Sequence, residues 1–533
     1  MARVDSLPEG AKEVLQTGSV IEREFNCELL KHVMGLPEQQ LLPHLSILKD
    51  SELLYERGIF PKSTSIFKHA LTREVVYDSI LTKRKKKLHD KIGKSIEALY
   101  KDNIEEHYGI LAEHYIAGEN YEKGAEYSRL TARKAEKTAS LNDAIAYAKK
   151  RISSLERLPA TDDVQKKIID ARTTLGLYYI QLNYHIEAKT AVDPIVGLAA
   201  RQNYKKRLSE IYTIIGTYNY LIEEDFLRAF EHLEEALKIS EQENDMVSLF
   251  FANQFIGLAL SLNCEFEKAL PCFAKALDIN VAANTLWGIS AMKCMIGYFV
   301  YYVSGKLDQG YKISDEAIVV AEESGDIYSK AMAYTNHGIL SYGKGFFEEA
   351  IKHLLQGVEL CERINLFFWN ALAQSNLGET YFQLGEYQKS KIHYSKAISL
   401  VAHKSMIPYW MNLNKMGLAL AKVMSHEKDI DLESLYVLEN KNKVKFCEGC
   451  MRRYIGEILL NIDDHHLTEA EAWINKAIEA DKRNGMILNL ARDHALYAQL
   501  LKRKGDPLKA EENLNTAKKI FRECGADEVM VRG

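Results

Sequence analysis

Small residues recur along this chain at intervals of about forty positions. In the clearest copy, Gly378 is followed twelve places later by Ser390 and seven places after that by Ala397. Each copy reads as two helices around a turn, so the recurrence predicts an array of helical hairpins. The first small residues of the successive copies are Gly176, Gly216, Gly257, Gly297, Gly338, Gly378, Gly417, Gly456 and Ala498.

The recurrence of glycine has a physical reason in helix packing. Glycine inside a helix is less stable than alanine by about 1 kcal/mol, so a periodic glycine needs a compensating gain. Close approach of two antiparallel helices supplies that gain. These spacings are those of tetratricopeptide repeats, although the usual period is 34. The period of about forty predicts longer second helices, such as one over 350–364, in a form that resembles the sensor domains of signalling ATPases and of maltose-regulon activators.

Composition is consistent with an ordered helical protein without a nucleic-acid or membrane partner. The 533 residues are 47% hydrophobic with only 9 prolines, and the formal net charge is -5, which gives no basic footprint for nucleic acid. The 8 cysteines form no even framework, so we expect reduced thiols and a cytoplasmic location. The N-terminus has no apolar signal-peptide core. The uncharged stretch 246–264 contains Gly257 in register with the repeat, so we interpret it as a buried repeat helix.

Residues 1–101 have a different pattern. Helices are expected at 11–17, 27–34 and 38–49, followed by strands at 53–57 and 65–68 around a turn at 58–64, and by helices at 71–81 and 83–100. Three helices followed by a β-hairpin predict a small winged-helix domain. Residues 102–160 form a helical connector with degenerate repeats, and residues 161–533 form the repeat solenoid. The predicted fold is therefore all-α, a tetratricopeptide-repeat superhelix of period about 40 preceded by a winged helix.

A family resemblance rests on several separated motifs in the first part of the chain. They are SVIEREF at 19–25, LLYER at 53–57, FKHALTREVVY at 67–77 and LH at 88–89. Together they resemble the segment that follows the ATPase domain in bacterial STAND-type signalling ATPases, including ATPase-linked class III adenylyl and guanylyl cyclases and related kinases. The tail IFRECGAD at 520–527 also resembles the ends of such chains. The resemblance implies the regulatory half of such a protein: a winged helix followed by repeats.

The chain departs from that family in its chemistry. Gly93-Lys-Ser95 has the ending of a Walker A loop, but position 88 is leucine and the context is the middle of a helix. There is no Ser/His/Asp set, paired-carboxylate motif or HExxH motif. We therefore expect no enzyme activity, no catalytic residue and no cofactor, with the chain either a fragment or a stand-alone regulatory half.

A binding groove is predicted on the concave face of the superhelix, which first helices line. Offsets of −6, −3, +1, +4 and +5 from the small residue identify the side chains that face it. Aromatic and neutral polar groups favour a protein or peptide partner, although the tyrosines could instead pack between helices. The predicted groove residues are Gln254, Tyr298, Tyr301, Tyr302, Tyr342, Glu379, Phe382 and Asn414.

Three other features have a functional and a structural interpretation. The resemblance implies that His69 could sense a nucleotide on an ATPase partner; the alternative is a histidine packed at a strand end. The basic run 83–87 could bind DNA beside a winged helix, but its helix also carries apolar residues, which favours a solvated face. Cys447 and Cys450 form a lone CxxC, and zinc needs four ligands, so no metal site is predicted.

Three functions remain open from the sequence. The first is a non-catalytic interaction and sensor module that binds a protein or peptide and regulates an ATPase, cyclase or kinase output, in cis or in trans. The second is a fragment of an adenylyl cyclase or ATPase whose catalytic half lies outside this chain. The third is a winged-helix transcription regulator with a repeat sensor.

Overall fold

The structure is a computed structural model that describes residues 4, 6–58, 63–138, 140–402, 407–427 and 430–527. Its internal contacts divide the chain into two units, Met1–Leu175 and Gly176–Gly533. Helices dominate both units and the only sheet among the described residues has three strands, so the predicted all-α class is confirmed. The predicted boundaries at residues 101 and 160 both lie inside the first unit, and this division does not test them.

The first unit combines a small sheet with helices. Its elements are α2 (Glu9–Ile21), β1 (Glu24–Asn26), α3 (Cys27–Met34), α4 (Glu38–Asp50), β2 (Leu54–Arg57), β3 (Thr64–Phe67), α5 (Ala70–Asp78), α6 (Thr82–Leu99), η1 (Lys101–His107), α7 (Tyr108–Ala117), α8 (Tyr121–Lys137), α9 (Leu141–Leu155) and the start of α10 (Asp162–Gln181).

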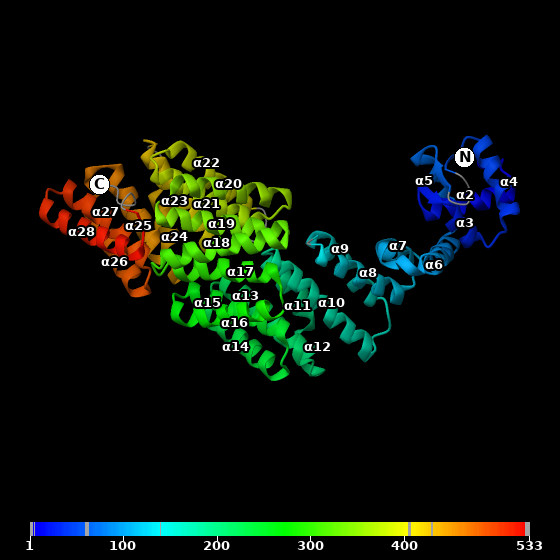
Figure 1. Ribbon diagram of the computed structural model, residues 1–533, viewed down its shortest axis with the longest axis horizontal. Coiled ribbons are helices and arrows are strands. Elements are labelled where there is room, and N and C mark those ends of the chain that lie inside the picture. Colours follow the sequence, from blue (N-terminus) through cyan, green and yellow to red (C-terminus); the bar gives the residue numbers. More distant parts are fainter. Residues whose placement is uncertain are drawn as a thin grey trace. The chain divides into compact units, whose positions relative to one another are not determined.

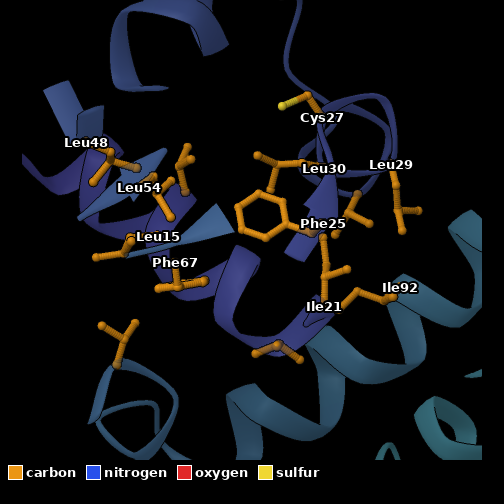
Figure 2. Packing of buried hydrophobic residues seen from close by; sticks show 14 of the residues in the cluster. Leu15, Ile21, Phe25, Cys27, Leu29, Leu30, Leu48, Leu54, Phe67 and Ile92 are labelled. Atoms are coloured by element: carbon orange, nitrogen blue, oxygen red, sulfur yellow. The ribbon is translucent and has the colours of Figure 1, made fainter. Parts of the chain in front are cut away.

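The sheet and the helices α2 to α7 enclose one hydrophobic core. The strands are antiparallel in the order β1-β3-β2, and Leu54 pairs with Phe67 across the hairpin. Figure 2 shows Phe25 and Phe67 pointing between the helices, where both rings are almost completely buried. A side chain at Gly18 of α2 would collide with the Phe25 ring at 2.6 Å, so this glycine lets the helix lie against the strand.

The sequence predicted the elements of this region well. The helices and both hairpin strands are present with shifts of a few residues, while most of the predicted turn at 58–64 lies outside the described residues. Strand β1 was not predicted, because three residues are too few to show an alternating pattern. The winged-helix assignment itself stays a prediction.

The second unit consists of helical hairpins that stack side by side (Figure 1). Its elements are α11 (His185–Val192), η2 (Asp193–Ile195), α12 (Val196–Arg201), α13 (Lys205–Leu221), α14 (Phe226–Glu243), α15 (Met246–Leu262), α16 (Phe266–Ala282), α17 (Leu286–Ile296), η3 (Gly297–Tyr302), α18 (Leu307–Ser324), α19 (Ile327–Lys344), α20 (Phe347–Arg363), α21 (Phe367–Gln383), α22 (Tyr387–Ala402), α23 (Pro408–Met424), α24 (Leu432–Asn440), α25 (Lys445–Ile462), η4 (Asp464–His466), α26 (Leu467–Asn484), α27 (Ile487–Arg503) and α28 (Pro507–Cys524).

The recurring glycines lie where two helices approach each other most closely. A methyl group on Gly378 would lie 3.0 Å from the Tyr394 ring, and one on Gly338 would lie 2.7 Å from Leu354 Cγ and 3.0 Å from its backbone nitrogen. Real Cβ atoms rarely come so close to a neighbour, so the predicted packing role of these two glycines is confirmed. Gly297 differs, since it begins a π-helical turn and a methyl group there would meet Ile313 at an ordinary 3.4 Å.

The uncharged stretch near residue 250 forms α15, a helix of the repeat array. Among the residues that the structure describes, no helix combines the length and the apolar character that crossing a membrane requires.

Two buried histidines face each other between α6 and α7. The Nδ1 atoms of His89 and His114 are 2.9 Å apart, and the hydroxyl of Tyr77 is 3.1 Å from His89 Nε2. One Nδ1 must donate and the other accept, which requires at least one neutral ring. Burial lowers the pKa of His89 to about 4 and that of His114 to about 3, so both rings are neutral near pH 7.

A matched pair of glycine substitutions tests the packing argument. Gly338→Ala forces a methyl group against a backbone nitrogen and is expected to destabilise the second unit by about 1–3 kcal/mol. Gly297→Ala has room for the methyl group and is expected to be neutral or stabilising by up to about 1 kcal/mol. Thermal unfolding followed by circular dichroism measures both; equal effects of the two variants would contradict the close-approach explanation.

The histidine pair predicts acid sensitivity of the first unit. A pKa lowered on folding adds stability above the unfolded pKa of about 6.5, and this stability is lost as the pH falls toward 4 and 3. Each histidine contributes up to about 1.4 kcal/mol per pH unit in that window. Protection factors from amide hydrogen exchange in α6 and α7 should therefore fall between pH 7 and pH 5. His114→Gln should flatten this dependence, and the same substitution at exposed His32 should not.

Candidate binding cavity in the second unit

A cavity of about 110 Å³ lies inside the second unit, between helices from the middle and the end of the repeat array. One water needs roughly 10–15 Å³ measured in this way, so the space holds on the order of ten waters. Aromatic rings form much of its wall, and the polar side chains come from α21, α25 and α27. The aromatic residues are Tyr298, Tyr302, Tyr342, Tyr394, Trp410, Phe446 and Tyr454, and the larger polar ones are Asn376, Glu379, Arg453, Asn489 and Arg492.

The cavity is a partly open pocket that forms where the last repeats contact the middle ones. An Arg492 guanidinium nitrogen lies 3.3 Å from the Tyr302 hydroxyl, 190 residues away in the chain. The backbone N–H of Asp527 donates to the carbonyl of Lys344 at 2.9 Å. Gly305 permits this approach, since a side chain there would lie 2.5 Å from Cys524 Sγ. The last repeats thus form one side of the pocket and the middle repeats the other.

Glu379 of α21 ties three other helices together at the cavity wall. One oxygen accepts the Tyr342 hydroxyl at 3.0 Å, and the other accepts those of Tyr394 at 2.7 Å and Tyr454 at 2.9 Å. Burial acts to raise the pKa of this carboxyl. The positive charge of Arg492 and the hydrogen bond from Tyr394 outweigh burial, so the pKa of Glu379 is lowered. The carboxylate is therefore charged and fully hydrogen-bonded.

Arg453 of α25 has its own counter-ions beneath the cavity. Its guanidinium donates to Asp493 at 3.1 Å and lies 3.9 Å from Asp481. Burial and the neighbouring Asp493 raise the pKa of Asp481 well above its usual value. Burial raises the pKa of Asp493 as well, although the charge of Arg453 opposes that shift. Arg453 therefore has two carboxyl partners within the protein.

Arg492 of α27 is the cation without an ion-pair partner at this site. In the described part of the chain no carboxylate lies within 4.0 Å of its nitrogens. It donates to the Tyr302 hydroxyl, its Nε has no hydrogen-bond partner, and its plane lies 5.1 Å from the Tyr342 ring centre. A partly buried guanidinium whose Nε–H has no partner, beside an open space, is suited to hold an anionic group.

The structure brings together half of the predicted groove residues. Tyr298, Tyr302, Tyr342 and Glu379 all line the cavity. Phe382 is buried against Tyr387, and the Asn414 side chain is buried, where it accepts from Ser375 and donates to the Trp410 carbonyl. The half-buried Gln254 and Tyr301 do not line the cavity. None of these placements tests binding, so the partner-binding role stays a prediction.

Sequence reasoning missed both arginines, although the signal was present. Arg453 is three places before Gly456 and Arg492 is six places before Ala498. These are two of the offsets that identified the tyrosines, but they were applied only to the middle repeats. Tyr394 belongs to a second helix, and no first-helix offset could have found it.

The remaining predicted features have clear positions. His69 precedes α5 and is exposed, so the alternative of a packed strand-end histidine is wrong, and its nucleotide-sensing role stays a prediction. In the basic run, Arg84 pairs with Glu13 and Lys86 with Glu119 at the surface. Burial raises the pKa of Cys447 well above its usual value and that of Cys450 to about 11, so both thiols are protonated.

Comparison with known proteins supports the repeat assignment. The sequence model of the tetratricopeptide repeat family matches residues 371–400, which lie in α21 and α22 and include Gly378, Ser390 and Ala397. The TPR repeat-containing protein YpiA of Bacillus subtilis (strain 168) is 23% identical over 220 residues, which are 39% of this chain and 47% of that protein. The chain thus spans about half the length of this curated relative.

Solved structures show similar folds at low identity. The STAND signal transduction ATPase with a tetratricopeptide repeat sensor, PH0952 from Pyrococcus horikoshii, is 14% identical with a TM-score of 0.36, over 98% of this chain and 64% of that one. A Rap protein complexed with competence and sporulation factor is 16% identical with a TM-score of 0.46, over 75% of this chain and 99% of that one. Likenesses of this size assign no function.

Replacing the central carboxylate tests its structural role. Glu379→Gln keeps the shape but replaces one acceptor oxygen by an amide donor, so at least one tyrosine hydroxyl loses its acceptor. The expected loss is about 1–3 kcal/mol of stability, measured by chemical denaturation at pH 7. Since the pKa of Glu379 is lowered in the folded state, its stabilisation is lost as the pH falls below about 4.3, and the variant should lack that part of the acid dependence.

A surface carboxylate provides the control for this prediction. Glu386 pairs with Lys389 at the surface, with 43% of its side chain exposed. Glu386→Gln should change stability by no more than about 0.5 kcal/mol. Equal losses in the two variants would contradict a special role of the buried carboxylate.

Proposed function

We propose that this chain is a non-catalytic interaction and sensor module, and that its repeat unit binds a protein or peptide partner through an anionic group placed beside Arg492. A peptide C-terminus or an acidic side chain supplies such a group. The proposal rests mainly on one observation, the partly buried guanidinium of Arg492, which faces a cavity and has no carboxylate partner within 4.0 Å among the described residues.

The size and lining of the cavity favour the end of a chain over a long segment. A space for on the order of ten waters accommodates one terminal residue of a peptide, with the rest outside. The rings of Tyr298 and Tyr302, whose centres are 5.7 Å apart, offer apolar contact for that residue. Asn376 and Asn489 line the same space and provide amide groups for the peptide backbone.

The charge balance at the cavity also favours an anion. Glu379 is occupied by three tyrosine hydroxyls, so it does not need a cation from the ligand. Arg453 is paired with Asp493 inside the protein. The charge of Arg492 acts on Glu379 without a direct ion pair, and a carboxylate from the partner would give its unpartnered Nε–H an acceptor.

Binding at this place can act on the curvature of the array. The walls come from repeats far apart in the sequence, which meet only when the last repeats contact the middle ones. A ligand that touches both parts stabilises the closed arrangement over an open one. We propose that this change is the signal passed to an ATPase, cyclase or kinase output, in cis or in trans, as the resemblance of the first unit to STAND-type regulators implies.

A pair of peptide libraries tests the binding proposal. Short peptides of random sequence with free C-terminal carboxylates are passed over the immobilised full chain, beside the same library with amidated C-termini, and retained peptides are identified by mass spectrometry. The free-carboxylate library should be retained preferentially. In Arg492→Gln the affinity for the retained peptides should fall roughly 10- to 100-fold, because a hydrogen bond to a charged group contributes about 1.5–3 kcal/mol.

Controls separate loss of the site from loss of the fold. Arg483 is a surface arginine of α26 that pairs with Glu448, and Arg483→Gln should keep wild-type affinity. Alanine at both Tyr298 and Tyr302 would remove two buried rings and is a poorer probe than the arginine change. If Arg492→Gln binds the same peptides as tightly as the wild type, the cavity is not the recognition site.

A further inference from the structure

A second group of chemically active side chains lies on the α19–α20 hairpin, apart from the cavity. His337 comes from α19, and Glu349 and His353 are four positions apart on α20. One donor atom from each of the three residues lies within 4.8 Å of the other two. The side chains are 3%, 33% and 16% exposed, respectively, so the group has a closed inner side and an open outer side.

The hydrogen bonds of this group leave two lone pairs facing each other, one on a histidine nitrogen and one on a carboxylate oxygen. The Ser314 hydroxyl donates to the carbonyl of Tyr311 at 2.8 Å, so it must accept at 2.9 Å from Nδ1–H of His337. In the neutral ring this leaves a lone pair on Nε2. That nitrogen lies 3.2 Å from Glu349 Oε1, which already accepts the Tyr311 hydroxyl at 2.8 Å. A cation between the nitrogen and the carboxylate resolves this conflict.

His353 adds a third donor with no other role. Its Nε2 lies 3.8 Å from Glu349 Oε1, which is too far for a hydrogen bond, and its buried Nδ1 has no partner among the described residues. The ring is held by stacking on Tyr334, with an angle of 12° between the planes. Burial and the neighbouring His337 lower the pKa of His353, so near pH 7 it is the neutral imidazole that metals bind.

We propose that His337, Glu349 and His353 bind a divalent transition metal ion, with Zn²⁺ the best chemical match. Two imidazoles and one carboxylate are a common three-residue zinc set, which leaves the fourth tetrahedral position for water or for a ligand from outside. The hydrogen bond from His337 to Ser314 is the outer contact that fixes the ring of a metal-binding histidine.

The distances need only a small adjustment for metal binding. Bonds of about 2.0–2.2 Å place the donor atoms of a tetrahedral zinc site about 3.4 Å apart. His337 and Glu349 are already 3.2 Å apart, Glu349 and His353 must approach from 3.8 Å, and the donor atoms of the two histidines lie within 4.8 Å of each other.

The repeat pattern alone does not account for these three residues. One period of forty residues later, the equivalent positions hold Leu377, Lys389 and His393. Only the histidine remains there. It stacks on Tyr381 at an angle of 15°, and its Nδ1 lies 2.7 Å from Gln374 Oε1. The same fold therefore contains a matched histidine without the other two ligands, which serves as a control.

The test uses the full chain after removal of metals with EDTA and dialysis, with ZnCl₂ titrated by calorimetry. The wild type should bind one equivalent of Zn²⁺ at this site, and Co²⁺ should give the visible absorption of a tetrahedral complex. His353→Gln and Glu349→Gln should each weaken binding at least as much as the roughly 10- to 100-fold loss known for outer contacts. His393→Gln should leave the titration unchanged.

Acid provides a second readout, because the imidazoles must be deprotonated to bind metal. Affinity should fall as the pH decreases below about 6.5. Circular dichroism establishes that each variant remains folded; both substituted side chains are partly exposed, so their loss leaves the hairpin packing intact. Absence of Zn²⁺ binding in the wild type, or the same titration in His353→Gln as in the wild type, would overturn the proposal and identify the group as an internal ion pair.

Discussion

Close approach of paired helices at small residues is the constraint on which the second unit depends. Where Gly338 or Gly378 lies against its partner helix, a single added carbon would meet backbone or ring atoms at 3.0 Å or less. A short distance between paired helices also determines the direction of the next pair, so small residues at regular intervals give the array a consistent curvature. The cavity is a consequence of where this curvature places side chains from distant repeats.

The curvature brings charged side chains into the interior, and these side chains differ in the hydrogen-bond and ion-pair partners that the protein gives them. Glu379 is stabilised by three hydroxyls from three other helices, an arrangement that fixes those helices relative to one another. Arg453 is paired with Asp493. Arg492 donates to the Tyr302 hydroxyl and acts on the Glu379 charge without a direct ion pair, while its Nε–H has no acceptor among the described residues. Glu379 and Arg453 have direct partners within the protein, whereas Arg492 keeps one donor free at the cavity wall, and this favours a site for a ligand.

Much of the fold could be predicted from the sequence because it is periodic. The spacing of Gly378, Ser390 and Ala397 predicted the helix pair that the tetratricopeptide repeat model also matches. The site was predicted only in part. Offsets along a first helix found Tyr342 and Glu379, but a contact between residues 190 positions apart, such as that of Arg492 with Tyr302, depends on the total curvature of several repeats. The periodicity of the sequence does not determine this total curvature.

The site includes a place where the repeat is irregular, and this follows from the same packing. At residues 297–302 the helix widens to a π-helical turn, and Gly297 has more space around it than Gly338 or Gly378. The wider turn carries Tyr298 and Tyr302, both of which line the cavity. The next turn includes Gly305, where the absence of a side chain admits Cys524 and Ile487 from the last repeat. Regular repeats hold the array together, and one irregular repeat both receives the end of the array and supplies the aromatic wall; a local departure of this kind is frequent at functional sites.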